Sequence, residues 1–231
     1  MGTDNLFHKK KARLAESHRR NKARRAPYER ILIVCEGKKT EPNYFKDLRK
    51  AFGLNPMNIV IADKKHGLDP MSLVECAIEE YKKEPDYNHV YCVFDRDKHQ
   101  TYDAALDKIS TYHMKRGTTL NPITSIPCFE IWLLLHFTYT TRSFCAACDD
   151  SNCALLISDL KKYIPAYEKG AENIFIGGES LGDAISRAKQ LEDFHKTSGT
   201  DNPSTKVYLL VEYLKCVKEE KEKGGESAFG Y

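Results

Sequence analysis

The order of apolar and polar positions along the chain predicts strands that alternate with helices. Short apolar runs without polar alternation are typical of strands buried on both faces. Such runs occupy residues 31–34, 57–62, 89–94 and 121–126. Apolar residues recur at helical spacing between these runs, over 40–52, 69–81 and 102–115. This alternation is typical of a parallel sheet with helices on its faces, so we expect an α/β fold.

The second half of the chain has a mostly helical pattern. Residues 127–137 are apolar nearly all round, which predicts a helix buried against the sheet edge, with Pro127 in its first turn. Amphipathic stripes follow, and Ser204 is expected to cap the last of the predicted helices. These stripes lie at 154–163, 179–194 and 204–217.

Acidic residues stand at the carboxyl ends of two predicted strands. Glu36 follows the first strand, and Asp95 and Asp97 follow the third. The carboxyl ends of parallel strands share one edge, and neighbouring strands lie about 4.8 Å apart, so the three carboxylates can converge on a hard cation. Turn and cap roles are the alternative, because Asp and Glu are common at strand ends. Two such clusters at two buried strands favour a metal site.

The turn after the first strand predicts how that site is built. Gly37 permits a tight turn with positive φ, and Thr40 can cap the helix that follows. Glu130 falls in the first turn of the buried helix predicted at 127–137. A buried carboxylate without a partner is costly, so Glu130 needs a metal, a base or the helix N-terminus beside it. A first-turn acid with no further role is the alternative reading of Glu130.

Four segments of the chain, in this order, resemble the RloB family, which is linked to phage abortive infection and restriction loci. They are residues 35–45 (CEGKKTEPNYF), 93–97 (VFDRD), 127–137 (PCFEIWLLLHF) and 202–205 (NPST). The Glu-Gly-x-x-x-Glu turn with a later Asp-x-Asp after a strand also resembles a TOPRIM domain, the metal-binding α/β module of topoisomerases, primases and OLD-type nucleases. Lys38 stands where such proteins often carry Glu, which suggests that this position is not a required ligand.

The resemblance implies a TOPRIM-like parallel sheet flanked by helices and a Mg²⁺- or Mn²⁺-dependent nuclease. The implied substrate is RNA, tRNA included, or DNA, and the implied role is anti-phage abortive-infection defence. Asp95 and Asp97 would hold the metal, and Glu36 would be a further ligand or the general acid or base. Glu41 and Glu130 would complete a second metal site. RloB-like proteins are typically encoded beside an ATPase of the AAA/SMC-related kind, which implies such a partner.

Basic and hydroxyl side chains near these motifs are candidates for phosphate binding. Lys38, Lys39 and Arg96 stand beside the carboxylates and could offset the charge of a phosphate. Ser204, Thr205 and Lys206 could place donors at a helix N-terminus. By spacing alone, the Asn-Pro-Ser-Thr stretch is simply a good turn and cap.

Charge is distributed unevenly along the 231 residues, whose net charge is +3. Residues 1–26 hold nine Lys and Arg against two acidic residues, which leaves the remainder with a net charge of −4. Such a basic arm suits phosphate backbones, and a solubilising leader is the alternative. We therefore expect a basic tail at 1–26, a TOPRIM-like α/β domain at 27–137 and a helical C-terminal elaboration at 138–231, packed on the same domain. The basic residues of the tail that we assign to nucleic-acid binding are Lys9, Lys10, Lys11, Arg19, Arg20, Arg24 and Arg25.

The eight cysteines do not indicate a disulfide framework, because we expect a cytosolic protein. Cys145, Cys148 and Cys153 resemble part of a zinc knuckle, with His136 or Cys128 as the fourth ligand. We favour cysteines without a metal in a loop over a structural Zn²⁺ site.

Other classes of function are less consistent with the sequence. The chain has no run of about 18 apolar residues and no apolar segment of a secretory signal, so we expect no membrane span and a cytoplasmic location. It also lacks a Gly-x-x-x-x-Gly-Lys-Ser/Thr phosphate loop. Two rivals to a nuclease remain: a phosphatase that uses Asp-x-Asp as the haloacid dehalogenases do, and a module that binds nucleic acid or the ATPase through a non-catalytic acidic site. The sequence leaves the oligomeric state open.

Overall fold

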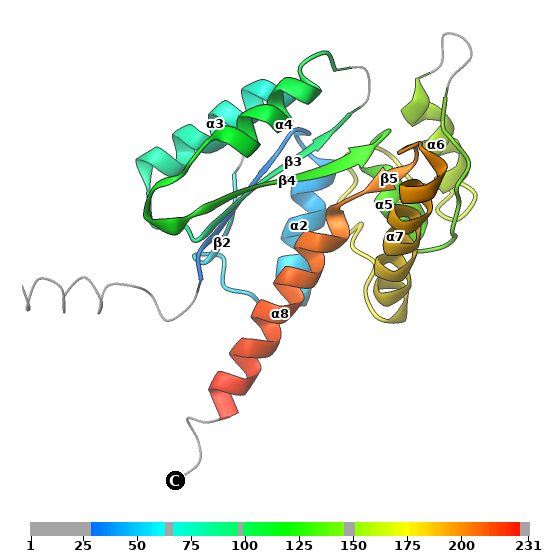
Figure 1. Ribbon diagram of the computed structural model, residues 1–231. Coiled ribbons are helices and arrows are strands. Elements are labelled where there is room, and N and C mark those ends of the chain that lie inside the picture. Colours follow the sequence, from blue (N-terminus) through cyan, green and yellow to red (C-terminus); the bar gives the residue numbers. More distant parts are fainter. Residues whose placement is uncertain (1–28, 63–66, 97–98, 146–150, 227–231) are drawn as a thin grey trace, which may run out of the picture.

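A computed structural model describes residues 29–62, 67–96, 99–145 and 151–226 and confirms the expected α/β fold. Its centre is a five-stranded sheet with the order β2-β1-β3-β4-β5 (Figure 1). The strands are β1 (Ile31–Cys35), β2 (Ile59–Ile61), β3 (His89–Asp95), β4 (Thr119–Ile126) and β5 (Ser204–Thr205). The four strands predicted from apolar runs are therefore present.

Strands β1 to β4 run parallel, and β5 pairs antiparallel with β4. The register places Cys35 of β1 beside Val93 of β3, and Asp95 of β3 beside Ser125 of β4. The residues that follow β1 and β3 therefore leave the sheet at the same edge. This edge is where ligands bind in open α/β sheets.

Helices cover both faces of the sheet (Figure 1). Helices α3 and α4 lie on one face, and α2, α8 and the group α5 to α7 lie on the other. The helices are α2 (Thr40–Ala51), α3 (Pro70–Lys83), α4 (Tyr102–Thr111), the short 3₁₀ helix η1 (Lys115–Gly117), α5 (Glu130–Leu135), α6 (Asn152–Leu160), α7 (Glu179–Ser198) and α8 (Val207–Glu226).

The buried side chains form two clusters because alternate residues of a strand point to opposite faces. Leu32 and Val34 pack under α3 and α4. Ile33 belongs to the larger cluster, which also holds Trp132 of α5 and Leu214 of α8. The helices after residue 138 thus share one core with the sheet. The domain boundaries that we expect at 26/27 and 137/138 remain predictions, and residues 1–26 lie outside the described part of the chain.

Several predicted helix ends were wrong. Helix α5 begins at Glu130, and Pro127 precedes it after a cis peptide bond with Ile126. Thr40 is the first residue of α2 and does not cap it. Ser204 lies in β5, where it pairs with Ile126, so it cannot cap α8.

Local sequence identifies a helix start when the cap lies within the same segment. Asp69 is the N-cap of α3, and its Oδ1 accepts hydrogen bonds from the backbone N–H groups of Met71 and Ser72. Two of the misplaced ends, Thr40 and Ser204, bond to a distant segment instead. Among the described helices, none is both long enough and apolar enough to cross a membrane.

Candidate active site

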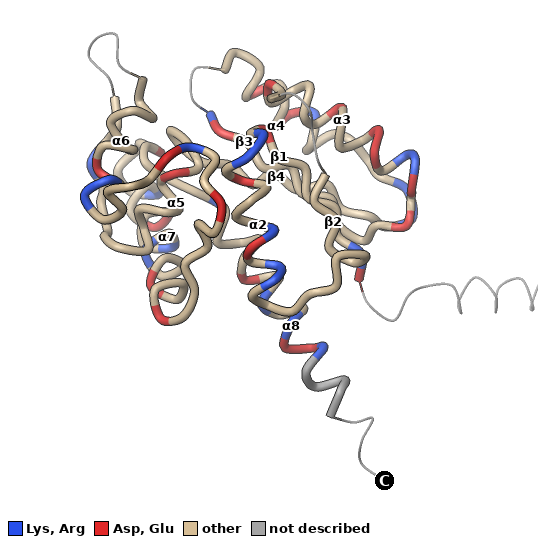
Figure 2. The backbone as a smooth tube through the Cα atoms, turned by 180° about the vertical axis from the view of Figure 1, so that it is seen from behind, with Lys and Arg blue, Asp and Glu red and all other residues tan. Residues whose placement is uncertain are grey.

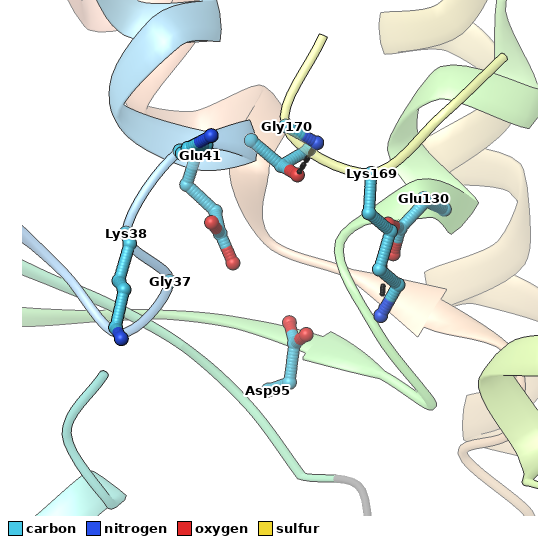
Figure 3. Close-up of a pocket in the computed structure, with 9 residues that line it drawn as sticks. Gly37, Lys38, Glu41, Asp95, Glu130, Lys169 and Gly170 are labelled. Atoms are coloured by element: carbon cyan, nitrogen blue, oxygen red, sulfur yellow. Dashed lines mark hydrogen bonds and ion pairs between the residues drawn. The ribbon is translucent and has the colours of Figure 1, made fainter. Parts of the chain in front are cut away.

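A pocket of about 290 Å³ lies at the edge where β1 and β3 end. It is lined by the turn after β1, the first residues of α2, the end of β3, the start of α5 and the segment between α6 and α7 (Figure 3). Its lining residues are Gly37, Lys38, Lys39, Thr40, Glu41, Asp95, Glu130, Lys169 and Gly170. Three of these are carboxylates, each from a different element.

Glu41 reaches the pocket from the first turn of α2, and only 6% of its surface is exposed. Gly37 makes this possible, because a Cβ atom at residue 37 would overlap the Glu41 carboxylate. The expected positive φ at Gly37 is wrong, since Gly37 is not among the glycines with positive φ. A side chain at residue 37 would therefore displace the Glu41 carboxylate from its present position.

Asp95 and Glu41 point toward each other across the pocket (Figure 3). Burial raises the pKa of Asp95 well above its usual range, and the neighbouring carboxylates Glu41, Glu130 and Glu36 raise it further. Burial also raises the pKa of Glu41 to about 7; Glu130 and Glu36 add to this rise, while a backbone hydrogen bond and Lys169 oppose it. Proximity of like charges away from water has this effect on carboxyl groups. Glu41 and Asp95 therefore hold their protons more tightly than exposed carboxyl groups do. The pocket also has three lysines against its three carboxylates, so basic and acidic positions lie side by side at this edge of the sheet (Figure 2).

Glu130 is 2% exposed and lies at the N-terminus of α5. Its Oε1 accepts a hydrogen bond of 3.0 Å from the Tyr167 hydroxyl and lies 3.9 Å from Lys169 Nζ. Partial burial acts to lower the pKa of Lys169, but the field of Glu130 and other groups nearby outweighs it and raises this pKa. Lys169 is therefore a protonated cation at the mouth of an acidic pocket.

The segment that carries Lys169 is tied to the start of α2. The backbone N–H of Gly170 donates to Thr40 Oγ1 over 2.9 Å, and Asn43 Nδ2 donates to the Gly170 and Ala171 carbonyls. Gly170 has a φ of +83°, a conformation that favours glycine. Thr40 thus uses its hydroxyl to hold a segment 130 residues away in sequence rather than to cap its own helix.

Glu36 lies beside this pocket but is not among the residues that line it. Its Oε2 accepts from the backbone N–H of Asp95, and its Oε1 pairs with His99 Nε2, both over 2.8 Å. Glu36 therefore fixes the end of β3, next to Asp95, and its field reaches both Asp95 and Glu41.

The predicted phosphate-binding residues lie in three places. Lys38 and Lys39 are exposed and line the pocket. Arg96 Nη1 lies 2.5 Å from Asp201 Oδ2, in the segment before β5. The third group, Ser204, Thr205 and Lys206, does not line the pocket.

Each member of that third group has a structural contact or a partner. Thr205 is buried, and its Oγ1 bonds to Ser125 and accepts from the N–H of Val207. Ser204 pairs with Ile126 in the sheet, and Lys206 pairs with Glu192 over 2.7 Å. These contacts join the start of α8 to β4 and to α7.

Some predicted site residues lie outside the described part of the chain. These are Asp97, Cys148 and the basic residues of the tail, Lys9, Lys10, Lys11, Arg19, Arg20, Arg24 and Arg25. Among the residues that the structure does describe, no three His, Cys, Asp or Glu side chains already stand in a metal-binding group. The roles that we assign to the site residues therefore remain predictions.

The cysteines of the predicted zinc knuckle lie in different surroundings. Cys153 is buried, while Cys145 is exposed, with its Sγ 3.1 Å from Ser143 Oγ. His136 is buried, with Nδ1 3.4 Å from Ser180 Oγ.

Sequence reasoning missed three residues of this site: Tyr167, Lys169 and His99. Tyr167 and Lys169 come from the segment between α6 and α7, which carries no motif. Only its length and the polar Tyr-Glu-Lys-Gly stretch at 167–170 mark it as more than a connection. His99 closely follows the Asp-Arg-Asp sequence at 95–97, which we expected to lie beside Glu36. Its position along the chain could therefore have marked it as a candidate.

Comparison with models of known protein families finds a match over most of the chain. The family model described as RloB-like protein matches residues 31–214, which is most of the chain. A search of curated proteins and a search of solved structures each found nothing that matches this chain.

Proposed function

The chain belongs to the RloB-like protein family, and on that premise we propose that it is a Mg²⁺- or Mn²⁺-dependent nuclease. The proposed substrate is RNA, tRNA included, or DNA, and the proposed role is anti-phage abortive infection. An AAA/SMC-like ATPase is the proposed partner.

One observation carries the proposal: Glu41, Asp95 and Glu130 converge on one pocket at the carboxyl edge of the sheet. Burial raises the pKa of both Asp95 and Glu41, and the repulsion among the neighbouring carboxylates raises both further. A divalent cation would relieve this repulsion, because an opposite charge nearby favours the ionised form of a carboxyl group.

The donor atoms fit a hard cation, since carboxylate oxygens are the ligands that Mg²⁺ and Mn²⁺ prefer. The described side chains do not form a finished coordination group, so cation binding would draw them closer together. Asp97 remains a proposed ligand, two residues after Asp95. A bound cation would polarise a phosphodiester and make water a stronger nucleophile at neutral pH.

The chain's own residues supply the remaining parts of such a site. Glu36 holds the backbone of Asp95 in place through its hydrogen bond to the Asp95 N–H. Tyr167 donates to one oxygen of Glu130 and so fixes the direction of the other. Lys38, Lys39 and Lys169 line the pocket and would offset the charge of a phosphate placed in it.

The test is Mn²⁺ binding and cleavage by Asp95→Asn and Glu130→Gln, with Asp107→Asn as the control. Asp107 is an exposed carboxylate on α4. Loss of an outer-shell partner already weakens metal binding about 10- to 100-fold, so loss of a ligand should weaken it at least as much. We expect both pocket variants to lose Mn²⁺ binding, and to lose cleavage of total RNA and plasmid DNA, while the control keeps both.

Anomalous scattering from a Mn²⁺-soaked crystal would name the ligands independently of any substrate. If Asp95→Asn binds Mn²⁺ and cleaves as the wild type does, the assignment is wrong. Tight nucleic-acid binding with no metal-stimulated cleavage, even with the ATPase present, would favour a binding module with a non-catalytic acidic site.

A further inference from the structure

An aromatic pair lies on the surface of the helical group, outside the pocket. Phe137, just after α5, and Tyr163, just after α6, stack with ring centroids 5.2 Å apart and planes 14° from parallel. Tyr163 is 46% exposed, and nearby in sequence Tyr139 is 40% exposed. A stacked ring that keeps much of its surface in water presents an apolar face that a flat partner can cover.

The pair lies within reach of the carboxylate pocket. Phe137 lies seven residues after Glu130, and the residues between them form nearly continuous helical turns. The two positions are therefore about 10 Å apart along the helix axis. Tyr163 precedes Lys169 by six residues of one segment, in which Pro165, Ala166 and Glu168 are exposed. A span of about 10 Å corresponds to about three nucleotides at the duplex spacing of 3.4 Å, and to fewer in an extended single strand. A strand with one phosphate in the pocket could therefore place a nearby base at the pair.

The charges around the pair suit a phosphate backbone. Lys161 and Lys162 are exposed and directly precede Tyr163. Arg142 and Lys162 both pair with Asp159, so these two cations share one acid. Among the described residues, the three cations that precede Tyr163 or share an acid with its neighbours, Arg142, Lys161 and Lys162, stand against the single acid Asp159, so together they carry a net positive charge.

We propose that Phe137 and Tyr163, with Lys161 and Lys162, form a contact surface for single-stranded nucleic acid. An unpaired base stacks on the free face of Tyr163 while the phosphates pass Lys161, Lys162 and Lys169 toward the pocket. A duplex cannot make this contact, because its bases are already stacked on one another. This inference rests on the proposed nuclease function and names its substrate class: an unpaired strand, loop or end.

The experiment compares Tyr163→Ala, Tyr163→Phe and Tyr112→Ala in the full-length protein. Tyr112 is a matched control, since it is a tyrosine at the end of α4 with Lys108 Nζ 5.9 Å from its ring centroid, and α4 covers the other face of the sheet. Binding of a fluorescent single-stranded oligonucleotide and of a duplex of the same sequence is measured in EDTA, so that no cleavage occurs. Thermal unfolding of each variant checks that the fold is kept.

We expect Tyr163→Ala to weaken single-strand binding at least about fivefold. Tyr163→Phe keeps the ring and should bind as the wild type does, as should Tyr112→Ala. Duplex binding should be unchanged in all three variants. Equal loss on single strand and duplex, no loss on either, or no single-strand binding by the wild type each overturn the proposal. The last two results would leave Tyr163 as a contact for a protein partner at most.

Failure of this inference is distinguishable from failure of the nuclease proposal. Binding in EDTA requires no metal and no chemistry, so a stacking contact can be demonstrated even if the protein cleaves nothing. Conversely, suppose that Asp95→Asn abolishes Mn²⁺-dependent cleavage of the single-stranded oligonucleotide, while Tyr163→Ala leaves both its cleavage and its binding unchanged. That result would support the nuclease and remove the stacking surface.

Discussion

At the scale of one residue, Glu41 shows how the fold changes the proton affinity of a carboxyl group. Its carboxyl group is buried, and burial together with Glu130 and Glu36 raises its pKa from 4.5 to about 7. In the unfolded chain the same group ionises near its ordinary value. The folded protein therefore holds this proton more tightly than the unfolded chain does.

The first prediction is a pH-dependent loss of stability that originates at Glu41. Because its pKa is higher in the folded protein, Glu41 contributes stability to the folded state. This contribution is fully present below about pH 4.5 and is lost as the pH rises to about 7. Across this pH range the free energy of unfolding should fall by about 3 kcal/mol. In metal-free buffer, Glu41→Gln should unfold at nearly the same urea concentration as the wild type near pH 5 and should be the more stable of the two at pH 8. A difference between the two proteins that stays constant across this pH range would contradict the pKa assignment.

The same residue predicts a pH dependence of cation binding. Mn²⁺ requires ionised ligands, so the wild-type affinity should rise as pH passes through about 7. Isothermal titration calorimetry at pH 6 and pH 8, in two buffers of different ionisation enthalpy, would show protons released on binding. The Glu41→Gln variant should release fewer protons, and equal release by both proteins would exclude Glu41 as the source.

At the scale of elements, the segment between α6 and α7 completes the pocket. It is held by hydrogen bonds from its backbone to Thr40 and from Asn43, both on α2. Gly170 is the residue that lets it approach so closely, because a Cβ atom there would lie 2.8 Å from Lys39 Cδ and 2.9 Å from Lys39 Cβ. The position of Lys169 therefore depends on a glycine rather than on a helix or strand.

This geometry predicts that Gly170→Ala loosens the segment. A non-glycine residue at positive φ costs about 1–3 kcal/mol, and the contact with Lys39 adds to this cost. Hydrogen exchange at residues 167–171 should accelerate, and metal-dependent cleavage should fall. Gly199→Ala is the matched control, since Gly199 has a φ of +69° and open space around its Cβ position. The control should lose a similar amount of backbone stability without changing exchange at 167–171 or cleavage.

At the scale of the whole molecule, one core joins the sheet to the C-terminal helices. Ile33 of β1, Trp132 of α5, Leu191 of α7 and Leu214 of α8 belong to the same buried cluster. The lone tryptophan of the chain is fully buried in it. The chain is therefore expected to unfold as one cooperative unit, although its two halves have different secondary structure.

Leu214→Ala tests this cooperativity. The change removes a fully buried side chain from α8 and should cost about 2–5 kcal/mol. Trp132 fluorescence and far-ultraviolet circular dichroism should shift to a lower urea concentration by the same amount. If the circular dichroism changed in two steps, or if the Trp132 signal stayed in place, the C-terminal helices would be a separate unit. Leu209→Ala, at a 45% exposed position on the same helix, should shift neither signal appreciably.

The sequence by itself determined the α/β alternation, the parallel strands and the acidic edge, because these follow from local periodicity and from the rule that parallel strands end at one edge. Asp95 could be named as a candidate for the same reason. Glu41 was implied by the family resemblance, and Glu130 by that resemblance together with the cost of burying an unpaired carboxylate. The family resemblance, carried by four short segments, was also available from the sequence and is confirmed.

Only the tertiary structure decided which side chains meet. The bonds of Thr40 to Gly170, Tyr167 to Glu130 and Glu36 to the N–H of Asp95 join positions 37 to 130 residues apart. No local pattern encodes such contacts, since each depends on where the whole chain places its loops. For the same reason Arg96 and Lys206 pair with acids away from the pocket. The physical cause is that periodicity fixes the face on which a residue lies, whereas packing of distant segments fixes its partner.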